Sequence, residues 1–142
     1  MDDLQIRPAT ASDAEAISEL LGELEHPASA AETHERLREL RANGDEVLVA
    51  TWGAAPVGLV ALHAAPMLHR AGRLGRITAL VVAESSRGRG VGARLVKAAE
   101  LWLAARDCRS VEVTSHNRRT SAHAFYDQVG FARSHARFLK AL

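Results

Sequence analysis

The order of hydrophobic and polar positions predicts a short strand and then two helices at the start of the chain. Residues 4–7 alternate and are followed by Pro8, as expected for a first strand. Apolar side chains then recur at helical spacing after Ser12. Ser12 and Ser29 each have a glutamate three residues later. This spacing predicts a capping box at each helix start. The second helix is expected to end near Asn43-Gly44.

Downstream, the pattern predicts strands and helices in alternation. Residues 46–51 and 57–63 are β-rich and flank a Gly-Ala-Ala-Pro turn, which favours an antiparallel hairpin. Residues 64–73 are expected to form a loop, and the apolar run 77–82 a buried strand. The remaining expected elements are a helix at 91–105, a strand at 111–114, a helix at 121–129 and a short hairpin within 131–139. The central strand–helix–strand unit should cross over right-handedly, so an α/β fold with a mixed sheet is predicted.

Composition narrows the classes of protein without indicating a function. A chain of 142 residues fits one domain spanning residues 1–142. The formal charge of +1 gives little attraction for nucleic acid, and no segment has the roughly 18–20 apolar residues that span a membrane. The first residues lack a basic start followed by an apolar run, so no secretory signal is expected. A cytoplasmic location is the default expectation.

The most informative segment is the glycine-rich loop that follows the buried strand, Arg87-Gly88-Arg89-Gly90-Val91-Gly92. Glycines permit positive φ and a close backbone approach to a ligand, and the helix start presents unpaired N–H groups. Together they favour an anion site suited to a pyrophosphate, to which Arg87 and Arg89 add charge. A nucleotide P-loop requires a Gly-Lys-Ser/Thr ending that is absent, and the glycine register differs from the Rossmann fingerprint.

The spacing Arg-x-x-Gly-x-Gly, at Arg87, Gly90 and Gly92, resembles motif A of the GNAT acetyltransferases, which binds the pyrophosphate of CoA. Further matches to that family are Leu80-x-Val82, Asn117 and Tyr126-x-x-x-Gly130-Phe131, so the resemblance covers nearly all of the chain. It implies a GNAT fold with a mixed sheet of about six or seven strands and about four helices. It also implies acetyl-CoA as cosubstrate.

The resemblance also implies roles for individual residues. The strand before the loop would bulge, so that the backbone of Leu80, Val81 and Val82 faces the pantetheine arm and the thioester, next to a sheet that splays apart. Asn117 and the loop 87–92 would complete the cofactor site. Tyr126 would contact the cofactor and act as the general acid for the CoA thiolate, with direct transfer and no acetyl-enzyme.

Two positions depart from the family pattern. Glu84 stands where the family often has proline, which is expected to change loop stiffness rather than binding. The glutamate that many relatives carry on the preceding strand is missing, because Thr78 and Ala79 occupy those positions. The alternatives for the general base are the histidines His63, His69 and His116, of which His63 is favoured. Water that relays the proton to solvent is a fourth alternative. No metal site is expected.

The acceptor amine is less well defined. The C-terminal tail and the pairs Leu62-His63 and Leu68-His69 look like those of aminoalkylphosphonate N-acetyltransferases. The arginines at 70, 73 and 76 have two interpretations, a solvated basic loop, which is favoured, and a patch that attracts an anionic substrate. The first hypothesis is therefore acetylation of a small-molecule primary amine. The alternatives are a protein or peptide N-acetyltransferase and a CoA-binding module without turnover. Because dimers are common among relatives, a homodimer is one assembly that the resemblance allows.

Overall fold

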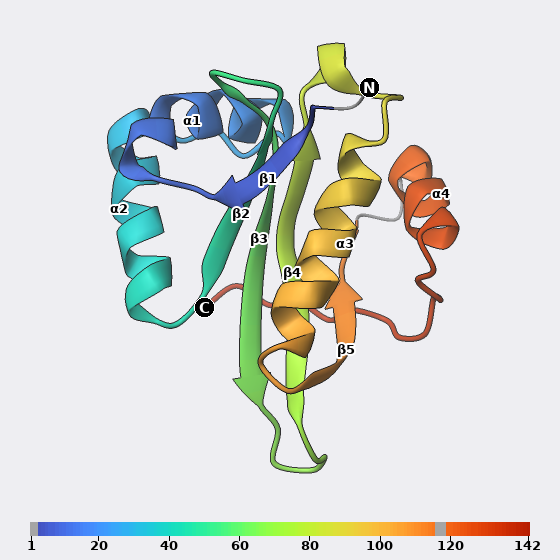
Figure 1. The fold of residues 1–142 in the computed structure, drawn as a ribbon. Helices are drawn as coiled ribbons and strands as arrows, with labels where there is room; N and C mark the ends of the chain where they lie inside the picture. The colour runs from blue at the N-terminus through green and yellow to red at the C-terminus, as the bar shows by residue number, and fades with distance from the viewer. Residues whose placement is uncertain (1–2, 116–118) are drawn as a thin grey trace. The chain divides into compact units, whose positions relative to one another are not determined.

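The structure is a computed structural model that describes residues 3–115 and 119–142 (Figure 1). The chain divides into two compact units, Met1–Glu112 and Val113–Leu142, and each is described by itself.

The first unit is organised around the sheet. Its five strands, in spatial and sequence order, are β1 (Gln5–Pro8), β2 (Glu46–Thr51), β3 (Pro56–Pro66), β4 (Arg73–Val82) and β5 (Cys108–Val113). The first four pair antiparallel. Figure 1 shows β5 pointing the same way as β4, so the sheet is mixed as predicted. The strands β3 and β4 extend into the region expected to be a loop, which shortens the connection to residues 67–72.

Among the described residues, three helices belong to the first unit and a fourth belongs to the second unit. They are α1 (Ala14–Glu23), α2 (Ala30–Ala42), α3 (Val91–Ala104) and α4 (Thr120–Gln128). Two 3-10 turns, Ala11–Asp13 and Glu84–Ser86, precede α1 and follow β4. The boundaries of α2 and β2 agree closely with the sequence pattern because their signals are local: a capping box at Ser29 and Glu32, and a left-handed Gly44.

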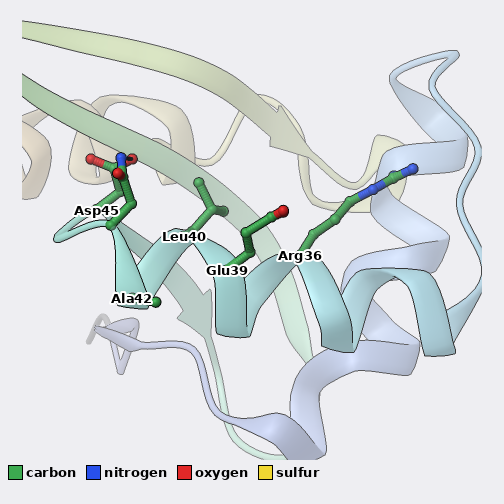
Figure 2. A pocket seen from close by; sticks show the side chains of 6 residues that line it. Arg36, Glu39, Leu40, Ala42 and Asp45 are labelled. Carbon is green, nitrogen blue, oxygen red and sulfur yellow. Dashed lines mark hydrogen bonds between the residues drawn. The ribbon is translucent and has the colours of Figure 1, made fainter.

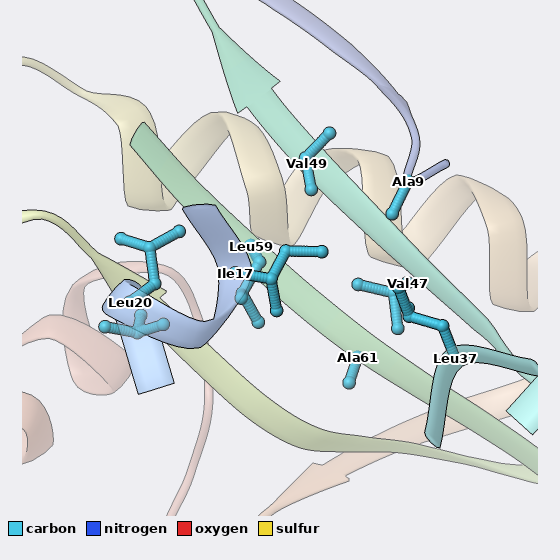
Figure 3. Packing of buried hydrophobic residues seen from close by; sticks show 9 residues of the cluster. Ala9, Ile17, Leu20, Leu37, Val47, Val49, Leu59 and Ala61 are labelled. Carbon is cyan, nitrogen blue, oxygen red and sulfur yellow. The ribbon is translucent and has the colours of Figure 1, made fainter. Parts of the chain in front are cut away.

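The helices of the first unit cover opposite faces of the sheet. A buried cluster joins α1 and α2 to strands β2, β3 and β4 (Figure 3) and consists of Ala9, Ile17, Leu20, Leu37, Val47, Val49, Leu59, Ala61 and Val81. On the other face α3 packs closely on β3 at Gly58. A Cβ there would lie 3.1 Å from Leu95 Cδ1 and 3.2 Å from Val91 Cγ1. The glycine therefore sets how near the start of α3 approaches the sheet.

The start of α1 differs from the prediction. The expected capping box at Ser12 and Glu15 is replaced by one at Thr10 and Asp13, which closes the 3-10 turn. The Asp13 carboxylate accepts a hydrogen bond from the Thr10 backbone N–H at 2.7 Å. It is also paired with Arg7, and this second partner explains why the aspartate competes successfully with the glutamate two residues later.

The predicted final hairpin within residues 131–139 is wrong. Among the described residues the sheet has five strands rather than six or seven, and the tail after α4 contains no strand. The tail has no glycine or asparagine turn after Gly130, and Phe138 and Leu139 are 93% and 79% exposed. Without a buried apolar face, a hairpin lacks the burial that stabilises it.

Candidate cofactor-binding and catalytic site

The strand β4 carries a β-bulge at Thr78. Ala79 pairs with Ala61 of β3 and Ile77 pairs with Leu62, so Thr78 has no partner residue in the register. Its hydroxyl donates to the carbonyl oxygen of Ala61 at 3.3 Å. An extra residue bends the strand and increases its twist locally.

The bulge also exchanges the two faces of β4. Directly paired residues share a face, so Ala79 lies with Ala61 on the face covered by α1 and α2. Ile77 lies with Leu62 on the α3 face, although strict alternation would place it beside Ala79. Of the two positions expected for the glutamate of relatives, Thr78 is bulged and exposed, whereas Ala79 packs against the cluster beneath α1 and α2.

The glycine-rich loop adopts the backbone conformation that its sequence predicts. Gly88 and Gly90 have φ values of 76° and 81°, and Gly90 is the N-cap of α3. The first bond of the helix runs from the Arg94 N–H to the Gly90 carbonyl at 3.1 Å. The preceding N–H groups, from Val91 onward, are therefore outside the helical ladder and near the positive end of its dipole.

The space above the loop is open. A Cβ placed on Gly88 or Gly90 would meet no atom within 4 Å. Nitrogen donors at a helix start with open space in front of them suit an anion of pyrophosphate size. The prediction of a pyrophosphate site rests on these two features of the loop, the helix-start donors and the open side of Gly88 and Gly90.

The two loop arginines have different surroundings. Arg87 Nε donates to the carbonyl oxygen of Val82 at 3.1 Å, which holds this side chain at the end of β4. The guanidinium carbon of Arg89 lies 4.0 Å from the ring centre of Trp52, in the turn between β2 and β3. Trp52 was not identified from the sequence, where an isolated tryptophan next to a turn gives no functional signal.

A contact between α1 and the loop involves the residue that departs from the family pattern. The Glu84 backbone N–H donates to Glu23 Oε1 at 2.8 Å. Proline at position 84 would lack this donor. Glutamate at position 84 therefore permits a tie between the end of α1 and the start of the loop.

His63 lies towards the C-terminal end of β3, and its imidazole is paired with a carboxylate. Its Nδ1 is 2.7 Å from Oδ1 of Asp45, whose side chain is only 7% exposed, whereas that of His63 is 37% exposed. A shallow hollow of about 540 Å³ adjoins Asp45 at the end of α2 (Figure 2). It is lined by Arg36, Glu39, Leu40, Ala42, Asn43 and Asp45. Sequence reasoning missed Asp45, because an acid after a helix-ending glycine looks like ordinary turn chemistry.

Tyr126 belongs to α4, in the second unit. Its ring centroid is 5.4 Å from that of Phe125 and 5.7 Å from that of Phe131, both edge to face. Burial raises the pKa of the Tyr126 hydroxyl above its ordinary value, and the positive charge of Arg119 opposes this only in part. The phenol is therefore protonated at neutral pH, as a proton donor must be.

Several other candidates are less informative. Asn117 and His116 lie outside the described residues. His69 is in the exposed connection between β3 and β4.

Burial raises the pKa of the Cys108 thiol, which disfavours the nucleophilic thiolate at neutral pH. The arginines at the start of β4 bind within the protein: Arg73 Nη2 donates to the Ala64 carbonyl oxygen at 3.1 Å, and Arg76 pairs with Glu112 at 2.7 Å.

Across residues 3–115 and 119–142, no three His, Cys, Asp or Glu side chains gather closely enough to hold a metal ion. Within the same ranges, no helix has the length and hydrophobicity needed to cross a membrane.

Comparisons with known proteins agree on one family. The sequence model of the acetyltransferase (GNAT) family matches residues 14–131 of this chain. An aminoalkylphosphonate N-acetyltransferase of Salmonella typhimurium is 37% identical over 86 residues. That match covers 61% of this chain and 56% of the relative, so the chain spans little more than half of that protein's length.

Solved structures are similar over nearly the whole chain. An acetyltransferase of Trypanosoma brucei is 28% identical with a TM-score of 0.83, covering 98% of this chain and 99% of that one. A transcriptional regulator from Bacillus halodurans is 24% identical with a TM-score of 0.90, at the same two coverages. At that identity the second likeness concerns the fold alone.

Proposed function

This chain belongs to the acetyltransferase (GNAT) family, and we propose that it transfers the acetyl group of acetyl-CoA directly to the primary amine of a small molecule. In this proposal residues 1–142 act as one acetyltransferase domain. The observation that carries it is the pair of left-handed glycines, Gly88 and Gly90, at the start of α3 with open space before them.

The cofactor-binding part of the proposal rests on the loop and on the strand before it. The N–H groups at the start of α3 would bind the pyrophosphate, with Arg87 and Arg89 at its edge. The backbone of residues 80–82 and Asn117 would contact the rest of the cofactor. The bulge at Thr78, just before this stretch, supports the idea that this part of β4 departs from regular pairing.

The chemistry requires the ammonium nitrogen to lose two protons, one before and one after its attack, and the departing thiolate to gain one. An alkylamine has a pKa of about 10, so its ammonium form must lose a proton before its nitrogen can attack. His63 would accept that proton. The nitrogen bonds to the thioester carbon, the carbon–sulfur bond breaks with its electron pair on sulfur, and Tyr126 would protonate the departing thiolate. The second proton, which the nitrogen loses as the amide forms, would return the Tyr126 phenolate to its protonated form. Backbone N–H groups of residues 80–82 would stabilise the charge on the carbonyl oxygen.

Direct transfer is favoured over an acetyl-enzyme. The thiol of Cys108 would be the acceptor in a two-step route, and its raised pKa opposes this. A small-molecule acceptor is supported by the Salmonella typhimurium relative, an aminoalkylphosphonate N-acetyltransferase. We further propose that the enzyme is cytoplasmic and that it forms a homodimer.

The deciding experiment is a calorimetric titration with acetyl-CoA, followed by thiol release in the presence of an aminoalkylphosphonate, a polyamine or a peptide. Micromolar binding with turnover on a small amine is expected. Turnover on the peptide alone would mean that the acceptor is a peptide amine and not a small molecule. Binding with no turnover on any amine would indicate a CoA-binding module, and absence of binding would refute the assignment of the loop.

A further inference from the structure

We propose that Asp45 is a positioning residue for His63: it keeps the proton on Nδ1, so that Nε2 is the nitrogen that accepts the proton of the acceptor amine. This inference rests on the role of His63 in the proposed function. It adds a residue and a tautomer that the sequence pattern did not indicate.

The hydrogen bond between the two side chains defines the tautomer. His63 Nδ1 and Asp45 Oδ1 are 2.7 Å apart. An ionised carboxylate can only accept a hydrogen bond, so the proton between the two atoms belongs to Nδ1. In a neutral imidazole the other nitrogen then carries the lone pair.

The burial of the pair gives the two residues different roles. The Asp45 side chain is 7% exposed, and its Oδ2 accepts a hydrogen bond from Asn43 Nδ2 at 3.1 Å. Both carboxylate oxygens therefore have partners inside the protein. The His63 side chain is 37% exposed, which allows a substrate to approach the imidazole.

The end of α2 holds Asp45 in place through a Schellman motif. The Gly44 N–H donates to the Arg41 carbonyl and the Asp45 N–H donates to the Leu40 carbonyl, at 3.1 and 2.9 Å. Gly44 has a φ of 85°, a value that glycine adopts without strain. This arrangement fixes the backbone of the residue after the glycine, so the carboxylate is presented to β3 by a rigid turn.

The neighbouring charges on the adjacent strands are satisfied elsewhere. Arg76, which pairs with His63 in the register of β3 and β4, forms an ion pair with Glu112 at 2.7 Å. Glu46, at the start of β2, pairs with Arg41 at 2.9 Å. Asp45 is thus the carboxylate that orients the imidazole.

The tautomer can be measured directly by long-range ¹H–¹⁵N NMR on protein labelled at its seven histidines. His63→Asn assigns the signal. Spectra are recorded at increasing pH until the His63 signals stop changing, which identifies the neutral ring. We expect the Nδ1–H form in the wild type and its loss in Asp45→Ala and Asp45→Asn. Circular dichroism checks that both variants fold.

Turnover gives the second readout. Both Asp45 variants should lower kcat by about tenfold or more with little change in acetyl-CoA affinity, since a misoriented base loses part of its contribution. Glu39→Gln is the matched control: it removes an exposed carboxylate from the same hollow and should change neither the tautomer nor kcat.

The outcomes separate this inference from the proposed function. An Nε2–H tautomer in the wild type would overturn the inference whatever the turnover, and so would Asp45 variants that keep both the tautomer and kcat. If Asp45 controls the tautomer while His63→Ala turns over at the wild-type rate, the imidazole is not the base. The catalytic role of the pair would then be overturned, while acetyl transfer itself would stand.

Discussion

The Phe131 backbone N–H donates to the Tyr126 carbonyl oxygen at 2.9 Å, and the two rings meet edge to face. Gly130, with φ 100°, donates its N–H to the Asp127 carbonyl at 3.2 Å. These bonds form a Schellman motif with its accompanying apolar contact. The family signature Tyr-x-x-x-Gly-Phe is therefore a helix cap that fixes the tyrosine ring against Phe131.

Replacing Tyr126 by phenylalanine tests its role as the acid. The ring contacts survive, so the fold and acetyl-CoA affinity should be kept, while kcat should fall by about 100-fold because protonation of the thiolate is lost. Steady-state kinetics and calorimetry provide the two measurements. Phe131→Leu is the control, since it alters the packing and retains the hydroxyl. An unchanged kcat for Tyr126→Phe would remove the tyrosine from the mechanism.

The pH dependence of kcat should report the ionisation of the Tyr126 phenol. Burial raises the pKa of Tyr126 above the ordinary tyrosine value of about 10, so at a given alkaline pH more of the phenol stays protonated than for an exposed tyrosine. Activity that depends on this proton is present below the raised pKa and is lost as pH rises through it. The midpoint of the alkaline fall should therefore lie above the ordinary tyrosine value, and the fall should be absent from Tyr126→Phe. A tyrosine-dependent fall near neutrality would contradict this.

The glycine-rich loop can be tested against a glycine of similar conformation. Gly90→Val introduces a side chain in the left-handed region and fills the open space before α3, so acetyl-CoA binding should be lost. Gly44→Val has nearly the same φ and an equally open surrounding, so it should lose similar stability and keep acetyl-CoA affinity. Thermal unfolding and calorimetry compare the two variants. Equal loss of affinity in both would mean that strain, not the site, explains the result.

The sequence predicted elements whose signals are local. The capping box at Ser29 and the helix-ending glycines lie close to where the pattern places them, because each depends on a few adjacent residues. A bulge on β4 was implied by the family resemblance alone, and its place at Thr78 could not be derived from the pattern of the chain because register depends on the partner strand. The contact between His63 and Asp45 joins residues 18 positions apart and depends on the packing of α2 against the sheet.

Glu84→Pro tests whether the tie between α1 and the loop matters for binding. Proline removes the N–H that donates to Glu23, yet its fixed φ suits the first position of a helical turn. The free energy of unfolding should therefore change by less than about 1 kcal/mol, with acetyl-CoA affinity unchanged. Glu23→Ala removes the acceptor instead and serves as the companion variant. A large loss of affinity in both would show that this contact orders the pyrophosphate loop.

The ion pair between Arg7 and Asp13 should dominate the acid sensitivity of the first unit. Arg7 donates to both carboxylate oxygens, at 2.7 and 2.9 Å, and the Asp13 side chain is only 5% exposed. The guanidinium lowers the pKa of Asp13 to about 2. Replacing Arg7 by methionine leaves a buried carboxylate short of a partner, which should cost about 1–3 kcal/mol of unfolding free energy at pH 7.

The pH dependence of this ion pair follows from the direction of the pKa shift. The folded pKa of Asp13 lies below its unfolded value of about 3.9, so the unfolded state binds the proton more readily. The stabilisation is full above about pH 5 and is lost as pH falls through 4 towards 2. Urea unfolding of the wild type and Arg7→Met at pH 7 and about pH 3 should therefore give a smaller difference at the lower pH. In the double variant Arg7→Met, Asp13→Asn, the unfolding free energy should depend even less on pH, because the titrating carboxylate is gone. A difference that is constant with pH would mean that Arg7 stabilises the fold through its packing and not through Asp13.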